Sequence, residues 1–252
     1  MIAAYGLVGS AALLLMATAV TADRPDARAP DLEGYYARWG DLHHGYDPRA
    51  NRWVRGLLRA SYALARPLAR WGVAPTALTL WGVWLAFAAL VAAHAGGRWP
   101  VVGGVLLVAS GFSDTLDGAV AAMTGRATRW GFVVDSLADR VTDVVYLVAV
   151  WAVGAPGWLA VACGVAFGLL EYLRARAGNA GMGQIGVVTV GERPVRVLLC
   201  AAALLLAGAV VEHHGLVAVV AVGVLAVLSA VALVQLAVVV HRTLAGARAG
   251  PP

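Results

Sequence analysis

Six long apolar segments constrain the fold of this chain more than any other feature. They cover residues 76–95, 100–122, 131–153, 157–176, 195–211 and 216–240. A helix of about 20 mostly apolar residues is long enough to cross the hydrocarbon core of a bilayer. Backbone N–H and C=O groups find no water in that core, so spanning segments form helices. The pattern predicts an all-α integral membrane protein built on a six-helix transmembrane bundle.

The composition of the 252 residues agrees with this class. Charged residues make up 13% of the chain and hydrophobic residues 61%, whereas soluble domains carry roughly 25% charged residues. An ordinary soluble domain is therefore excluded. The net charge of +5 suits a protein with one face on an anionic lipid surface. We expect the lipid bilayer, and no nucleic acid, as a partner.

Three further segments flank the bundle. Residues 1–21 are apolar over just enough length to span a bilayer, which predicts an extra N-terminal transmembrane anchor helix. Ala17-Thr18-Ala19 also resembles a signal-peptide cleavage site, so removal of this segment is an alternative. Residues 22–48 are polar and contain prolines, which predicts a cytoplasmic linker. Residues 246–252 are expected to form a cytoplasmic tail.

Residues 49–71 have the pattern of an amphipathic helix. Small and apolar side chains take one face, and arginines recur at helical spacing on the other: Arg52, Arg55, Arg59, Arg66 and Arg70. Such a helix lies in the headgroup plane on the cytoplasmic side, with Trp53 and Trp71 as interfacial anchors. Pro67 is expected to bend or break the helix near its end.

The arginines in the connections predict the orientation. The connections after the second, fourth and sixth segments hold Arg126, Arg129, Arg174, Arg176, Arg193, Arg196, Arg242 and Arg248. The opposite connections carry Arg98 as their one arginine. Because cytoplasmic loops are enriched in arginine, the first group of connections is expected in the cytoplasm. We expect a multi-pass protein of the plasma membrane whose active site faces the cytoplasm.

Four aspartates lie in two of the apolar segments. Asp114 and Asp117 share one helix face, and Asp135 and Asp139 share another. Four carboxylates cannot stay ionised together in surroundings of low polarity unless cations neutralise them. All-oxygen ligation suits hard cations such as Mg²⁺, Mn²⁺ or Ca²⁺. The spacing predicts a metal site, and two divalent ions bridged by such acids are suited to displacement at phosphorus.

Small and cationic residues beside these acids favour a ligand that carries phosphate. Gly118 has no Cβ and lets a ligand approach the helix backbone closely, and Ala121 continues this small surface. Hydroxyl and guanidinium groups, which suit phosphate oxygens, are present in the link between the two acid-bearing segments: Thr124, Arg126, Thr128 and Arg129.

The acid-bearing segments resemble the signature of the CDP-alcohol phosphotransferases, which are six-helix membrane enzymes of phospholipid synthesis. The matching motif is Asp114-x2-Asp117-Gly118-x2-Ala121 followed by Gly131-x3-Asp135-x3-Asp139. The resemblance extends over roughly residues 50–245, and we expect a CDP-alcohol phosphotransferase domain over 49–245. Residues 172–177 and 192–196 are most similar to the actinobacterial phosphatidylinositol phosphate synthases of this family.

The resemblance implies a role for each matching residue. Asp114, Asp117 and Asp135 match metal ligands, and Asp139 matches an acid that contacts metal and accepts the proton of the attacking alcohol. The CDP-lipid is expected to contact Thr76, Ala77, Leu78, Thr79, Asp117, Gly118, Ala121, Arg126, Thr128 and Arg129. A phosphorylated acceptor is expected to contact Arg174, Arg193 and Arg196. These arginines could instead serve only to end helices at the cytoplasmic face, which is our interpretation of Arg242.

The implied reaction moves a phosphatidyl group from CDP-diacylglycerol to a hydroxyl of a polar alcohol and releases CMP. The implied cofactor is Mg²⁺ or Mn²⁺, as two ions, and the family resemblance implies a homodimer. Inositol phosphate is the first choice of acceptor, with glycerol phosphate, phosphatidylglycerol or inositol as alternatives. From other functional classes, a cation transporter and a catalytically silent scaffold are considered. A structural alternative for the aspartates is ion pairing with Arg126, Arg129 and Arg140.

The chain departs from the family pattern at two positions. The family has arginine directly after the position of Ala121, where this chain has Ala122. We hypothesise that Arg126 or Arg129 supplies the missing positive charge to the nucleotide. The phosphatidylinositol phosphate synthases carry lysine at the position of Arg174, and arginine binds phosphate with a different geometry. An acceptor other than inositol phosphate therefore stays open.

Overall fold

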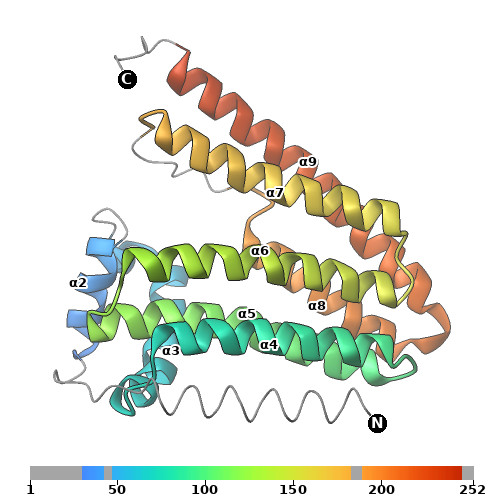
Figure 1. Ribbon diagram of the computed structural model, residues 1–252, viewed down its shortest axis with the longest axis horizontal. Helices are drawn as coiled ribbons and strands as arrows, with labels where there is room; N and C mark the ends of the chain where they lie inside the picture. Colours follow the sequence, from blue (N-terminus) through green and yellow to red (C-terminus); the bar gives the residue numbers. More distant parts are fainter. Residues whose placement is uncertain (1–29, 43–46, 183–188, 246–252) are drawn as a thin grey trace. The chain divides into compact units, whose positions relative to one another are not determined.

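The computed structural model describes residues 30–42, 47–182 and 189–245 (Figure 1). Every regular element in these ranges is a helix: α2 (Leu32–Leu42), η1 (Pro48–Ala50), α3 (Arg52–Arg70), α4 (Pro75–His94), α5 (Trp99–Thr124), α6 (Arg129–Ala152), α7 (Gly157–Asn179), α8 (Arg193–Ala209), η2 (Val211–His213) and α9 (His214–Leu244). The all-helical prediction is confirmed for this part of the chain. The predicted anchor at 1–21 and the tail at 246–252 lie outside the described residues.

The helices α4 to α9 lie over the six predicted apolar segments. Within the described ranges, four helices are long and apolar enough to cross a membrane: α4, α5, α7 and the stretch Val211–Leu244. The helices α6 and α8 do not meet this requirement of length and apolar composition. The segment α6 carries Asp135, Asp139 and Arg140 among its apolar residues, and α8 has 17 residues and begins with Arg193. The structure thus supports a membrane protein, with four spans by length and composition.

The chain divides into two compact units. The first consists of Met1–Ala88 with Ala109–Thr142, and the second of Ala89–Val108 with Asp143–Pro252. The helices α4, α5 and α6 each contribute to both units. The metal and nucleotide residues predicted from the sequence belong to the first unit, and the predicted acceptor arginines belong to the second.

The segment predicted to be a linker contains the helix α2, which the sequence analysis did not predict. Leu32, Tyr35, Tyr36 and Trp39 follow a spacing of i, i+3, i+4 and i+7, which gives α2 one apolar face. Tyr35 and Tyr36 are buried in the core of the first unit. The carboxylate of Asp31 accepts a hydrogen bond from the backbone N–H of Gly34 and caps the start of this helix.

The helix α3 is amphipathic as predicted, and it continues through Pro67 to Arg70. Its five arginines are exposed, while Leu58, Ser61 and Ala65 are buried. The helix ends at Gly72, whose φ of 74° is in the left-handed region that glycine adopts without strain. The N–H of Val73 donates to the carbonyl of Leu68 and closes this turn. The helix α4 then begins at Pro75.

In the second unit, α9 packs against both α7 and α8. Leu170 of α7 and Ala232 and Leu236 of α9 form one of its buried clusters. The start of α5 and the end of α8 approach so closely that a Cβ on Gly208 would lie 2.5 Å from the backbone nitrogen of Val101. Only glycine fits at this contact.

Ala122, the residue that replaces the family arginine, is buried in the first unit. It is 3% exposed and belongs to the cluster that holds Tyr35 and Tyr36 of α2. Arg38 of α2 donates a hydrogen bond of 2.6 Å to the backbone carbonyl of the neighbouring Met123. The small side chain at position 122 thus lies in the buried cluster to which α2 contributes.

We predict that Ala122→Arg destabilises the protein by about 2 kcal/mol or more, because a guanidinium would be overpacked and desolvated beneath α2. Thermal unfolding in detergent measures this loss. Ala63→Arg, at an exposed position of α3, is the matched control and should leave the melting temperature nearly unchanged. Equal melting temperatures for the two variants would contradict the burial of Ala122.

Candidate functional site

The first unit contains a cavity of about 700 Å³. Its walls come from α2, α3, the start of α4, the second half of α5, the link 125–128 and the start of α6. Two of the predicted metal ligands on α5, Asp114 and Asp117, line it together with Asp135 of α6. Three of the four predicted metal ligands therefore line one cavity.

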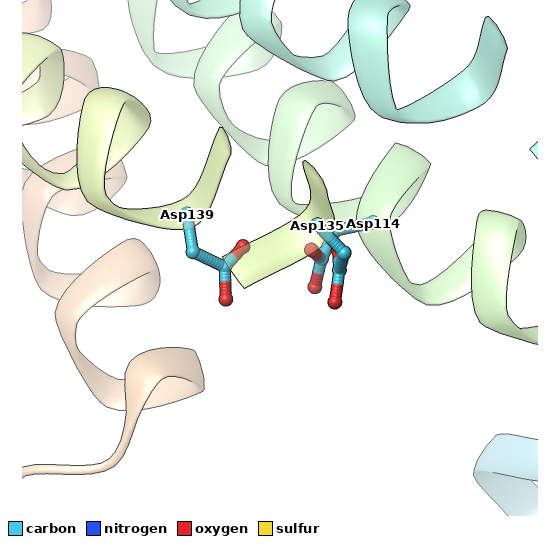
Figure 2. Close-up of side chains that lie close together, drawn as sticks. All are labelled: Asp114, Asp135 and Asp139. Carbon is cyan, nitrogen blue, oxygen red and sulfur yellow. The ribbon is translucent and has the colours of Figure 1, made fainter. Parts of the chain in front are cut away.

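Three of the four aspartates come together. One carboxylate oxygen from each of Asp114, Asp135 and Asp139 lies within 4.8 Å of the other two. Figure 2 shows the three carboxyl groups directed to the same side, with Asp114 and Asp135 next to each other. Each side chain is partly buried. An all-oxygen donor set of this spacing fits a hard divalent cation, and the cluster could hold a metal ion.

Asp117 has a different position from these three. It is 6% exposed, and its Oδ2 accepts a hydrogen bond of 2.5 Å from the hydroxyl of Thr79 on α4. Asp117 follows Asp114 by three residues, and on an α-helix this spacing places the two side chains about 60° apart around the helix axis. The side chain of Asp117 therefore lies toward α4. The sequence predicted four metal ligands, and three of them form the group that could hold a metal ion in the described part of the chain.

The link between α5 and α6 is fixed by local hydrogen bonds. Gly125 has a φ of 68°, and the N–H of Arg126 donates to the carbonyl of Ala121, which closes the end of α5. The hydroxyl of Thr128 accepts a hydrogen bond of 2.9 Å from the N–H of Gly131 and caps α6. Thr128 therefore has a structural role in addition to the ligand contact predicted from the sequence.

Seven of the ten predicted CDP-lipid residues line the cavity: Thr76, Thr79, Asp117, Gly118, Ala121, Arg126 and Thr128. Ala77 and Leu78 are buried, Arg129 is exposed, and none of these three lines the cavity. Of the two arginines expected to replace the family arginine, Arg126 is the one at the cavity. Sequence reasoning missed Tyr35, Trp39 and Leu57 as lining residues, although the apolar spacing of α2 was a usable signal.

Asp139 forms an ion pair of the kind that the structural alternative for the aspartates predicts. Arg140 NH2 lies 3.9 Å from Asp139 Oδ2, and both side chains are partly exposed. A pair at this distance and exposure contributes little to stability. It leaves the grouping of the three carboxylates in place.

Arg196 of the second unit is surrounded by protein acceptors. Its guanidinium donates to Asp143 Oδ2 at 3.1 Å, to Glu171 Oε1 at 3.0 Å and to the carbonyl of Gly191 at 2.7 Å. It also lies over the ring of Phe167, 4.5 Å from the centroid. The residue is 1% exposed. Breaking a buried pair by removal of one partner is strongly destabilising, so Arg196 has a clear structural role.

Arg174 and Arg193 join the same network of charges. Arg174 is paired with Glu192 and lies 3.5 Å from Glu171, and Arg193 Nε lies 4.0 Å from Asp143 Oδ1. Burial raises the pKa of Glu192, but hydrogen bonds from Arg174 and Thr189 outweigh it, and the pKa of this carboxyl is lowered overall. The three predicted acceptor arginines therefore face Asp143, Glu171 and Glu192. Glu171, three residues before Arg174, was the sequence signal for this pairing.

Comparisons with known proteins agree with the motif. The family model described as CDP-alcohol phosphatidyltransferase matches residues 72–232. An archaetidylinositol phosphate synthase of Methanothermobacter thermautotrophicus is 38% identical over 48% of this chain and 62% of its own length. A phosphatidylinositol phosphate synthase of Streptomyces avermitilis is 30% identical over 79% of this chain and 85% of its own.

A solved structure is also similar. It is a crystal structure of Mycobacterium tuberculosis phosphatidylinositol phosphate synthase with CDP-DAG bound, and it is 26% identical with a TM-score of 0.62. The match covers 77% of this chain and 100% of that one. The likeness thus extends from the motif to the arrangement of the helices.

We predict that the carboxylate cluster binds a divalent cation in the absence of any substrate. Titration of the purified chain with Mn²⁺, followed by electron paramagnetic resonance, measures the affinity. Asp135→Asn should weaken it by more than roughly tenfold, because loss of a ligand costs at least as much as loss of an outer-shell partner. Asp41→Asn, at an exposed position of α2, is the control. Equal affinity of the two variants would rule out the cluster as the metal site.

Proposed function

Because the chain belongs to the CDP-alcohol phosphatidyltransferase family, we propose that it transfers a phosphatidyl group from CDP-diacylglycerol to a hydroxyl of a polar alcohol and releases CMP. The observation that supports this most is the cavity of the first unit. It brings the carboxylates of Asp114 and Asp135 together with the small helix surface at Gly118 and the guanidinium of Arg126. Binding of an anionic diphosphate requires cations that neutralise its charge and a helix backbone that it can approach closely.

In this proposal the acids hold two Mg²⁺ or Mn²⁺ ions, with Asp114, Asp135 and Asp139 as the main ligands and Asp117 beside them. Such ions neutralise the diphosphate and make its phosphorus more electrophilic. Asp117, held by Thr79, connects the acid-bearing helix to the segment Thr76–Thr79, which contacts the cytidine. Arg126 supplies the positive charge that the family arginine provides elsewhere.

Asp139 acts as the general base on the acceptor. The acceptor oxygen forms a bond to the phosphorus of the phosphatidyl group, its proton moves to a carboxylate oxygen of Asp139, and the bond from that phosphorus to the CMP oxygen breaks. CMP leaves with the electron pair. A positioned carboxylate base accelerates such a step by roughly 10²–10⁴-fold.

We propose inositol phosphate as the acceptor. The similar proteins named above are phosphatidylinositol phosphate or archaetidylinositol phosphate synthases, which supports this choice. Arg174 and Arg193 keep part of their side chains exposed, at 21% and 15%, whereas Arg196 is held at 2%. The acceptor phosphate would therefore be bound by Arg174 and Arg193, with Arg196 fixing the acids around them. Glycerol phosphate, phosphatidylglycerol and inositol are the alternative acceptors.

We also propose that all six helices from α4 to α9 lie in the plasma membrane, with the cavity open to the cytoplasm and a homodimer as the assembly. The exposed arginines of α3 support contact with the anionic cytoplasmic leaflet. The family membership argues against the cation transporter, and the clustered acids at a cavity argue against the silent scaffold.

The central test offers the purified chain CDP-diacylglycerol with each acceptor and Mg²⁺, and measures CMP and the lipid product. We expect CMP release with inositol phosphate and a loss of at least roughly 10²-fold in Asp139→Ala. Glu212→Gln, an exposed acid of η2, should keep the wild-type rate. Full activity of Asp139→Ala would remove this residue from the mechanism, and absence of CMP release with every acceptor would refute the function.

A second prediction concerns Gly118. A Cβ at this position meets no heavy atom within 4 Å, so Gly118→Val is expected to fold normally while its side chain enters the space of the ligand. CMP binding should weaken by roughly tenfold, the equivalent of about 1.4 kcal/mol. Gly168→Val in α7, where a Cβ is equally unobstructed, is the matched control. Unchanged CMP affinity in Gly118→Val would place the nucleotide elsewhere.

A further inference from the structure

The helix α2 forms part of the cavity wall although it precedes the residues that the family model matches, 72–232. Tyr35 and Trp39 of this helix line the cavity together with Leu57 and Leu58 of α3. Its aromatic residues therefore contribute to a site whose other walls carry the family motif.

Hydrogen bonds hold α2 in this place at both ends. Before its start, the carbonyl of Pro30 accepts a hydrogen bond of 3.0 Å from the hydroxyl of Tyr62 on α3. Toward its end, Arg38 donates to the carbonyl of Met123, the residue next to Ala122. Because α2 is fixed to α3 and α5 at once, its aromatic side chains are held in position beside the cavity before any ligand arrives.

The cavity has two chemically different walls. One carries Asp114, Asp117 and Arg126, and the other carries Tyr35, Trp39 and the two leucines of α3. The donor proposed above has a charged diphosphate and an uncharged pyrimidine ring. The charged wall suits the diphosphate, whereas aromatic faces stack on nucleobases. Burial raises the pKa of Tyr35 to about 12, so its phenol stays neutral and does not repel the phosphates.

The aromatic wall lies next to the segment assigned to the cytidine. Tyr35 belongs to the same buried cluster as Leu78, and Trp39 and Val73 pack against that cluster. Thr76 of the same turn lines the cavity. The acyl chains of the donor can stay in the bilayer, whereas the base must enter the polar cavity with the diphosphate. The base is therefore the part of the donor that suits this wall.

We propose that Trp39, supported by Tyr35, contacts the cytosine ring of the CDP-lipid and acts as a positioning and specificity residue for the donor. The proposal rests on the proposed function, since it assumes that the cavity binds this nucleotide. It also gives a reason for Ala122. Ala122 belongs to the buried cluster that includes Tyr35 of α2, and an arginine there would place a charge in this cluster.

The test compares the full chain with Trp39→Leu and Trp39→Phe. Loss of one base–aromatic contact should weaken CMP binding by about tenfold in Trp39→Leu, while Trp39→Phe keeps most of the affinity because it keeps an aromatic face. The same factor should appear for CDP-diacylglycerol, as a higher KM with kcat close to wild type, because the contact exists before and during the reaction. Trp158→Leu, an exposed tryptophan of α7, is the control.

The outcomes separate this proposal from the proposed function. Wild-type CMP affinity in Trp39→Leu overturns the role of Trp39 alone, and so does a loss that affects CDP-diacylglycerol but not CMP, since the contact would then be with the lipid. A wild-type chain that neither binds nor releases CMP overturns the proposed function and this proposal with it. If Trp39→Leu does not fold, tryptophan fluorescence decides: a CMP-induced change as large in Trp39→Phe as in wild type overturns the contact.

Discussion

The mutual repulsion of three carboxylates is the constraint on which the first unit depends. Oxygens of Asp114, Asp135 and Asp139 lie within 4.8 Å of one another, and charges at that distance in a weakly polar setting require cations or protons. The short link between α5 and α6 keeps the acid-bearing parts of these helices together in spite of this repulsion. Gly125 ends α5, and Thr128 caps the start of α6. A metal ion would turn the repulsion into ligation. The same link places Arg126 at the cavity, so acid cluster and phosphate-binding cation come from one local structure.

The second unit also contains buried charges, and here side chains of opposite charge compensate them. Arg174, Arg193 and Arg196 are balanced by Asp143, Glu171 and Glu192. Removal of one buried partner would leave a charge without compensation, so these residues depend on one another. In the proposed function the network holds two arginines partly exposed and ready for an anion, while the third organises the acids.

Much of the fold was accessible from local patterns. The apolar segments predicted the six helices α4 to α9 closely, because hydropathy and length act along the chain. The helix α2 was missed: the prolines and polar residues of 22–48 concealed the apolar spacing of Leu32, Tyr35, Tyr36 and Trp39. Its stability comes from burial against α3 and α5, which a local reading does not contain. The same limit applies to the hydrogen bond between Thr79 and Asp117, which joins α4 to α5 and which the spacing of residues along the chain does not predict.

The sequence by itself determined the helical class, the chemistry of the acids and the family, since each of these is encoded in residue type and spacing. Only the tertiary structure decided which acids meet, which arginines are already paired and which wall α2 provides. These outcomes depend on contacts between residues far apart in the chain, such as Arg38 with Met123 or Arg196 with Asp143. Ala122 illustrates the difference. The sequence marks it as a missing arginine, and the structure shows it as a buried member of the cluster that includes Tyr35 and Tyr36 of α2.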